Sequence, residues 1–127
     1  MKKIGFIGAY DKTDMIIYIA KLLVENGLKI LIVDATTLQK TRYTVPCITP
    51  SRSYITTYED IDIAIGFETL QGIKNYIQTP ELEYDMILLD VDNENAFESL
   101  EMYTSDKNYF VTAFDNYSLK RGLEIVG

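Results

Sequence analysis

The chain contains 127 residues, of which 47% are hydrophobic and 24% are charged. This length fits one globular domain spanning residues 1–127, and the composition argues against a disordered chain. The sequence has no histidine and one cysteine, Cys47, so zinc and copper sites and Ser-His-Asp or Cys-His catalysis are excluded. Among metal ions, only those held by carboxylates, such as Mg²⁺, remain possible.

The formal net charge is −7. An acidic domain repels phosphate backbones at long range, so no nucleic-acid partner is expected. The N-terminus does not resemble a secretory signal, and no apolar run approaches the roughly 20 residues that span a bilayer. A single cysteine suits a reducing compartment. We therefore expect a cytoplasmic domain without a transmembrane segment.

The spacing of apolar residues predicts the first strand and the first helix of the chain. Residues 3–8 form a short apolar run that predicts a buried strand ended by Gly8. After a turn, residues 13–26 predict a helix, because apolar residues recur there at steps of three and four: Ile16, Ile19, Ala20 and Leu23. Thr13 is expected to cap this helix at its start, and Gly27 stands where a residue following a helix end belongs.

Strands and helices alternate along the rest of the chain. Further strands are predicted over residues 28–33, 54–57, 61–65, 86–89 and 109–114, with 54–57 as a short edge strand. Further helices are predicted over residues 67–77, 95–103 and 118–126. This alternation predicts an α/β domain with a doubly wound, mainly parallel sheet and helices on both faces, in a Rossmann-like three-layer arrangement.

Chemistry-bearing residues gather where the predicted strands end. Lys12 and Thr13 follow Gly8 at the start of a helix, and Asp34 and Asp90 follow two apolar strands. A phosphate loop needs glycines whose backbone N–H groups surround the phosphates, a lysine, and a hydroxyl for Mg²⁺ at a helix N-terminus. In parallel sheets the ligand crevice lies beyond the carboxyl ends of the strands, where these residues are expected.

Three segments of the chain resemble the ParA/MinD family of P-loop ATPases, which carry a deviant Walker A loop. Residues 26–34 (NGLKILIVD) are similar to the family's "GKKVLLID" strand, and residues 84–90 (YDMILLD) to its "YDYIIID" Walker B strand. Residues 110–114 (FVTAF), followed by Tyr117 and Ser118, look like its "VTTPD…S" segment. The resemblance implies a P-loop NTPase-like fold, nucleotide contacts from Gly8, Lys12 and Thr13, and Mg²⁺ held by Thr13, Asp34 and Asp90.

The loop departs from the family pattern KGGxGK[ST]. Aligned on Lys12 and Thr13, the pattern places Ile7 at the signature lysine and Ala9 and Asp11 at glycine positions. A side chain at position 11 crowds a tight turn that often needs positive φ, and its charge faces the phosphates. We therefore expect no bound cofactor and no ATPase activity. Mg²⁺–ATP is the cofactor that the resemblance implies if the loop is active.

The resemblance and these departures together predict a degenerate, non-hydrolysing ATPase domain. Its expected role is a positioning or assembly adaptor with protein partners, of the kind that localises pili or secretion systems. Family members pair around nucleotides, so a homodimer is implied as well, although Ile7 removes the lysine that supports that pairing. Family members are about twice this length, so the chain is expected to match their N-terminal portion.

Two other functions remain open at this point. The strands ending at Asp34 and Asp90 are also similar to the first and third strands of a bacterial response-regulator receiver, with Asp90 as phospho-acceptor and Thr112 as switch hydroxyl. Against this, Asp34 lacks the usual second acidic residue, and no later strand supplies the receiver lysine. The third possibility is a protein-interaction module in which Asp34 and Asp90 only cap strand ends.

Overall fold

The computed structural model describes residues 1–37 and 53–111. They form a six-stranded sheet with the strand order β3-β4-β2-β5-β1-β6. Only the β3–β4 pair is antiparallel. In chain order the elements are β1 (Lys2–Ile7), α1 (Thr13–Glu25), β2 (Ile30–Asp34), β3 (Tyr54–Tyr58), β4 (Ile61–Ile65), α3 (Leu70–Ile77), β5 (Met86–Val91), α4 (Glu94–Ser99), the 3₁₀ turn η1 (Met102–Thr104) and β6 (Lys107–Phe110).

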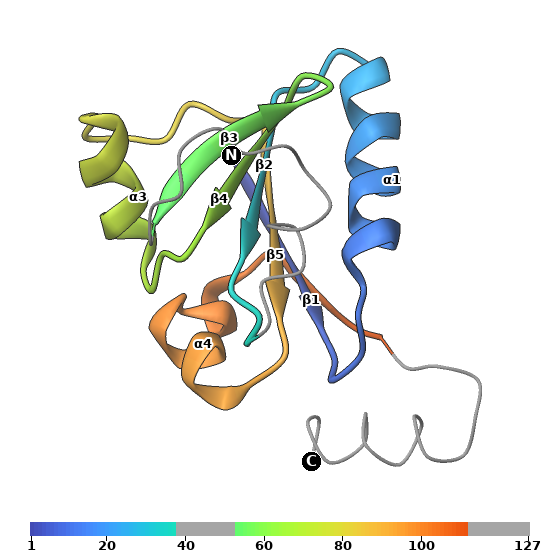
Figure 1. The fold of residues 1–127 in the computed structure, drawn as a ribbon, viewed down its shortest axis with the longest axis vertical. Helices are drawn as coiled ribbons and strands as arrows, with labels where there is room; N and C mark the ends of the chain where they lie inside the picture. The colour runs from blue at the N-terminus through green and yellow to red at the C-terminus, as the bar shows by residue number, and fades with distance from the viewer. Residues whose placement is uncertain (38–52, 112–127) are drawn as a thin grey trace.

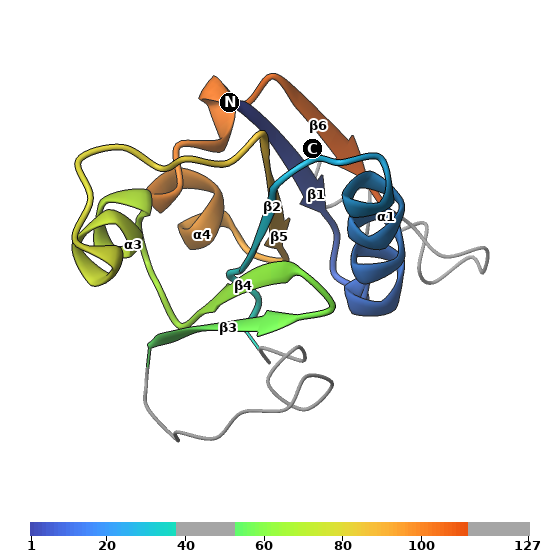
Figure 2. The ribbon, with the colours of Figure 1, turned by 90° about the horizontal axis from the view of Figure 1, so that it is seen from above.

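The described elements lie in three layers. Helix α1 covers one face of the sheet, and α3 and α4 cover the other (Figures 1 and 2). Each face has its own buried cluster, because the central strands are apolar on both sides. Side chains such as Ile16, Ile32 and Leu88 pack on the α1 face, whereas Leu31, Leu89 and Ile73 pack on the opposite face. The predicted three-layer α/β architecture with a mainly parallel sheet is confirmed.

Helix α1 shows how local sequence sets its ends. At its C-terminus, Gly27 has φ +84°, its N–H donates to Val24, and the Leu28 N–H donates to Leu23. This is a Schellman ending, which favours glycine because of the left-handed backbone. The expected cap at the other end was wrong: Thr13 is the first helical residue, and Lys12, in the N-cap position, makes no side-chain capping bond.

Other predicted boundaries also differ from the structure. Helix α3 begins at Leu70, because the Thr69 side chain caps it by accepting from the Gly72 N–H. The helix predicted over residues 95–103 is split into α4 and η1, since Glu101 adopts a left-handed backbone between them. Strand β6 starts at Lys107 rather than at Tyr109.

Parts of the predicted pattern lie outside the described residues. These are the end of the strand predicted over 109–114, the helix predicted over 118–126, Cys47 and Thr112. No helix within residues 1–37 and 53–111 is long and apolar enough to cross a membrane.

Candidate functional site

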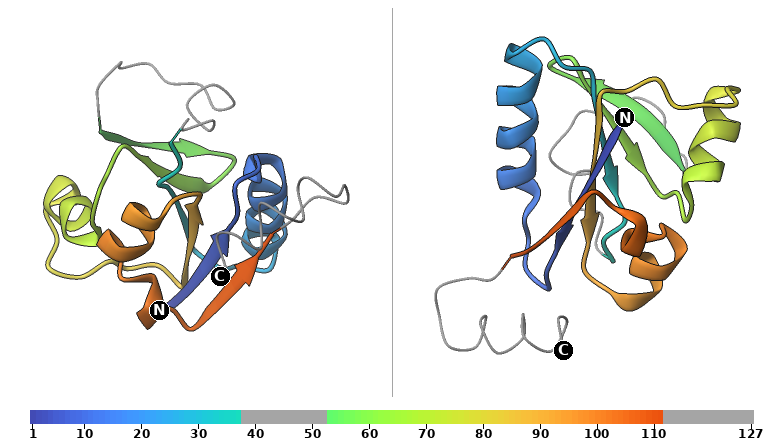
Figure 3. Two further views of the ribbon diagram at one scale, coloured as in Figure 1. Left: turned by 90° about the horizontal axis from the view of Figure 1, so that it is seen from below. Right: turned by 180° about the vertical axis from the view of Figure 1, so that it is seen from behind.

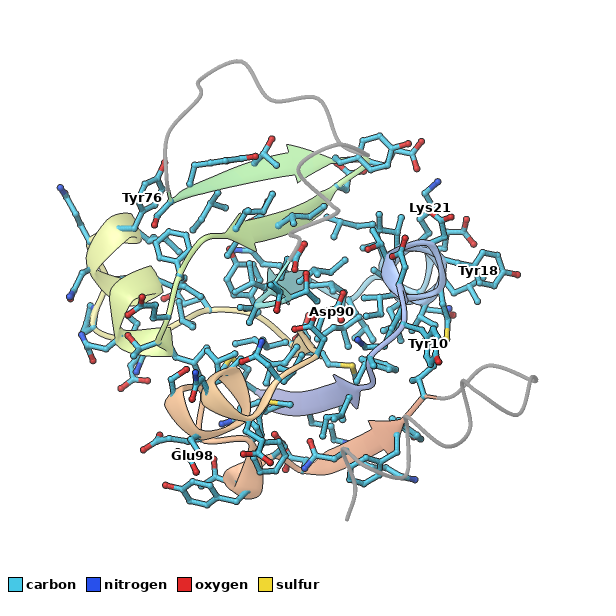
Figure 4. The ribbon with its side chains drawn as sticks, turned by 60° about the horizontal axis from the view of Figure 1, so that its bottom comes forward. Tyr10, Tyr18, Lys21, Tyr76, Asp90 and Glu98 are labelled. Atoms are coloured by element: carbon cyan, nitrogen blue, oxygen red, sulfur yellow. The ribbon has the colours of Figure 1, made fainter. Side chains whose placement is uncertain are left out.

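The predicted site residues meet at the carboxyl edge of the sheet. Strand β5 lies between β1 and β2, so the loop after β1 stands beside the end of β5. Asp34 and Asp90 are partners in the β2–β5 register. Figure 4 turns this edge toward the viewer, with Asp90 near the centre and Tyr18 and Lys21 pointing outward from α1. The topology thus gathers residues from three distant parts of the sequence.

Lys12 is turned inward, toward the end of β5. Its Nζ lies 2.7 Å from Asp90 Oδ1 and donates to the Gly8 carbonyl at 2.9 Å. Both side chains are buried, with 0% and 2% of their surface exposed. The cation that would reach phosphate oxygens in a phosphate loop is therefore engaged by the protein's own carboxylate and backbone.

The Asp11 side chain is likewise engaged within the protein, at the start of α1. Its Oδ1 accepts a hydrogen bond from the Thr13 N–H at 3.0 Å. This N–H is one of the backbone donors at the helix N-terminus. The expected strain is absent, since Asp11 is not among the residues with positive φ. An Asx-type turn accommodates the side chain instead. A carboxylate of the chain thus stands where a phosphate loop presents N–H groups to an anion.

Gly8 has a steric reason to be glycine. A Cβ at this position would collide with the backbone carbonyl oxygen of Val111, which follows β6. The Gly8 N–H donates to the Val91 carbonyl and the Val111 N–H to the Ile7 carbonyl, so three strand ends are drawn together here. Close backbone approach accounts for this glycine without any ligand.

The environment of Asp90 raises its pKa. Burial of the carboxylate is the largest cause, and it outweighs the opposing attraction of Lys12; Asp34 and Asp92 raise the pKa further. The resulting pKa is about 6. A carboxyl group with this pKa is partly protonated near neutral pH, which weakens its pairing with Lys12 under mildly acidic conditions.

Asp34 and Asp92 organise the loop after β2. Asp34 Oδ1 accepts from both the N–H and the hydroxyl of Thr36, at 3.0 and 2.6 Å. Asp92 accepts from the N–H of Thr37 at 3.0 Å and from Asn93. Sequence reasoning singled out Asp34 but gave no role to Asp92. The signal for Asp92 is its place two residues after Asp90, at the carboxyl end of the same strand.

Two hollows of very different size lie at this edge. The space beneath the Lys12 loop measures about 40 Å³ and is lined by Thr13 and Asp90, among others. A neighbouring crevice of about 470 Å³ is lined by Asp34, Phe67 and Asn93, among others. Asp34 therefore faces a different hollow from Lys12 and Thr13, and the residues predicted to share one Mg²⁺ are divided between the two.

Little open space remains beneath the Lys12 loop in this conformation. A volume of about 40 Å³ is close to the share of one liquid water molecule, roughly 30 Å³. The donors that an anion requires are taken by Asp90, Gly8 and Asp11. Within the described residues, no group of three acidic or cysteine side chains is arranged to hold a metal ion.

Comparison with known proteins found no match for this chain. No protein-family model matches the chain, no curated protein matches it, and no solved structure matches it.

Proposed function

We propose that this domain is a degenerate ParA/MinD-like ATPase domain that binds no nucleotide and acts as a positioning or assembly adaptor. The observation that carries the proposal is the buried ion pair of Lys12 with Asp90. The arrangement retains Gly8, Lys12 and Thr13 of a phosphate loop but directs the lysine inward. The expected partners are proteins, because neither the acidic charge nor the loop suits a phosphate-bearing ligand.

The charges around the loop support the absence of nucleotide. Asp11 holds the Thr13 N–H, so a phosphate at the start of α1 must displace a bonded carboxylate. Two like charges about 4 Å apart repel by about 4 kcal/mol at the effective dielectric constant of a protein surface. Binding must also break the contact between Lys12 and Asp90, which leaves Asp90 buried without its cation. Both costs oppose nucleotide binding.

The strand order favours this proposal over a receiver. In a receiver sheet the order is 2-1-3-4-5, so the third and fourth strands are neighbours. Here the corresponding strands, β5 and β6, are separated by β1. Asp90 is also 2% exposed and paired with Lys12, whereas a phospho-acceptor must be open to attack.

Calorimetric titration with ATP and ADP, with and without Mg²⁺, tests the proposal. We expect no saturable binding up to millimolar nucleotide. Asp11→Gly frees the Thr13 N–H and removes a charge, so it should bring weak binding into the measurable range. Asp11→Asn removes only the charge and separates the two effects. Asp14→Asn is the matched control, since Asp14 is an exposed carboxylate in the first turn of α1.

Micromolar binding by the unchanged protein that disappears in Lys12→Ala would contradict the proposal and identify a nucleotide switch. Equal behaviour of Asp11→Gly and Asp14→Asn would contradict the role given to Asp11. The contact between Lys12 and Asp90 would then be the remaining obstacle to nucleotide at this edge.

A further inference from the structure

The α1 face of the sheet carries a large apolar groove. It measures about 670 Å³ and lies between α1 and the strands β1, β5 and β6. Phe6 forms part of its floor and stacks on Tyr109 of β6, with ring centroids 5.6 Å apart. Tyr109 and Phe110 remain 44% and 49% exposed. Among the described elements, α1 is the helix on this face, and the sheet extends sideways beyond α1 through β1 and β6 (Figure 3).

The wall of the groove has the pattern of a helix-packing surface. Met15, Ile19 and Leu23 of α1 line it at steps of four residues. Tyr18 and Leu22, which lie four residues apart in a neighbouring row of α1, are 63% and 43% exposed. Apolar residues at three- and four-residue spacing on an otherwise exposed helix side favour a second helix lying alongside. An occupant with helical apolar spacing therefore fits this groove.

We infer that residues 118–126 of the same chain form this second helix and fill the groove. Val111, the last described residue, lines the groove, so the chain leaves β6 at its rim. Leu119, Leu123 and Val126 repeat the four- and three-residue spacing. At 1.5 Å per residue they span about 11 Å, against about 12 Å from Met15 to Leu23.

The connection and the direction of the chain also agree. Residues 112–117 reach at most about 20 Å when extended, which is ample for a turn at the carboxyl edge. A helix that follows β6 and returns along the sheet runs parallel to α1, which itself follows β1. A short tether gives an effective concentration in the millimolar range, so the chain's own segment outcompetes a second copy at micromolar protein. This inference does not depend on the nucleotide proposal.

Disulfide trapping in the full chain tests the inference. In a Cys47→Ser background, Ile19→Cys with Leu123→Cys should form an intramolecular bond on mild oxidation. Tyr103→Cys with Leu123→Cys is the control, since Tyr103 is 70% exposed and follows α4, on the other face. The groove pair should react roughly tenfold or more faster than the control pair. Equal rates, or a bond that links two chains, would overturn the inference, the latter by placing a second copy in the groove.

A charge variant with the native cysteine provides the second measurement. Leu123→Glu should expel the helix and raise the fluorescence of a hydrophobic dye several-fold. Arg121→Glu introduces the same side chain on the opposite side of the predicted helix and should leave the signal unchanged. A signal that fails to rise in Leu123→Glu, or rises equally in both variants, would show that the groove has another occupant or none.

Discussion

Removing the Lys12 ammonium group tests the central contact of the molecule. In Lys12→Met the side chain keeps its approximate length but loses both the ion pair with Asp90 and the bond to the Gly8 carbonyl. Asp90 then lies in the sheet with 2% of its surface exposed and without a cation. Breaking a buried pair by removing one partner costs about 3–5 kcal/mol, because the remaining charge is uncompensated.

The size of this cost should depend on pH. Asp90 has a folded pKa of about 6, above its ordinary value of 3.8. The contribution of the Asp90 carboxyl group to the free energy of unfolding is therefore fully present below pH 3.8. It is lost as the pH rises to about 6, and the loss is roughly 3 kcal/mol in all. Removing Lys12 takes away the attraction that lowers this pKa, so the pKa of Asp90 rises further. The penalty of Lys12→Met should then be larger at pH 8 than at pH 5.

Urea denaturation of the unchanged protein and of Lys12→Met, each at pH 5 and pH 8, measures how the cost depends on pH. The double variant Lys12→Met/Asp90→Leu is the control, because replacing both partners by apolar groups is often neutral or stabilising. We expect its stability at pH 8 to lie within about 2 kcal/mol of the unchanged protein. A cost for Lys12→Met that is the same at both pH values would refute the reasoning, since the ionisation of Asp90 would then be irrelevant.

Two further variants test individual contacts of the fold. Gly8→Ala should cost about 1–3 kcal/mol in thermal or urea unfolding, because its Cβ meets the backbone at the end of β6. Gly72→Ala, in α3, meets only ordinary contacts and should be neutral or stabilising by up to about 1 kcal/mol. Tyr84→Phe removes the hydroxyl that donates to Asp62 at 2.7 Å and should cost about 1–2 kcal/mol, against no change for the exposed Tyr103→Phe. Equal effects within either pair would contradict the assignment of these contacts.

Most of the fold could be predicted from the sequence, because the patterns that indicate its helices and strands are local. The continuous apolar run ending at Asp34 predicts a strand covered on both faces, and the structure places it between β4 and β5. Gly27 marks the end of α1 for a reason that depends on a few neighbouring residues. The missed break at Glu101 depends instead on a left-handed backbone that non-glycine residues rarely adopt, and no local pattern predicts it.

The site was only partly predictable, because its contacts join distant parts of the chain. The spacing of Lys12, Asp34 and Asp90 relative to their strands was enough to expect them at one edge. The direction in which Lys12 points depends on burial and on competing acceptors, which one-dimensional spacing does not encode. The role of Asp11 at the Thr13 N–H likewise depends on a turn geometry that sequence reasoning took to be strained.

The central place of β5 has a consequence for how the chain reaches its native state. Strands β1 and β2 are consecutive parallel strands in the sequence, but they touch each other only through β5, which pairs Lys2 with Met86 on one side and Ile30 with Met86 on the other. A growing chain therefore carries two unjoined sheet edges until residues 86–91 have been made. Parallel pairing across such sequence distances is slow, and unpaired apolar strands are prone to aggregate. During synthesis, the emergence of β5 is thus the step after which the two halves of the sheet become one cooperative unit.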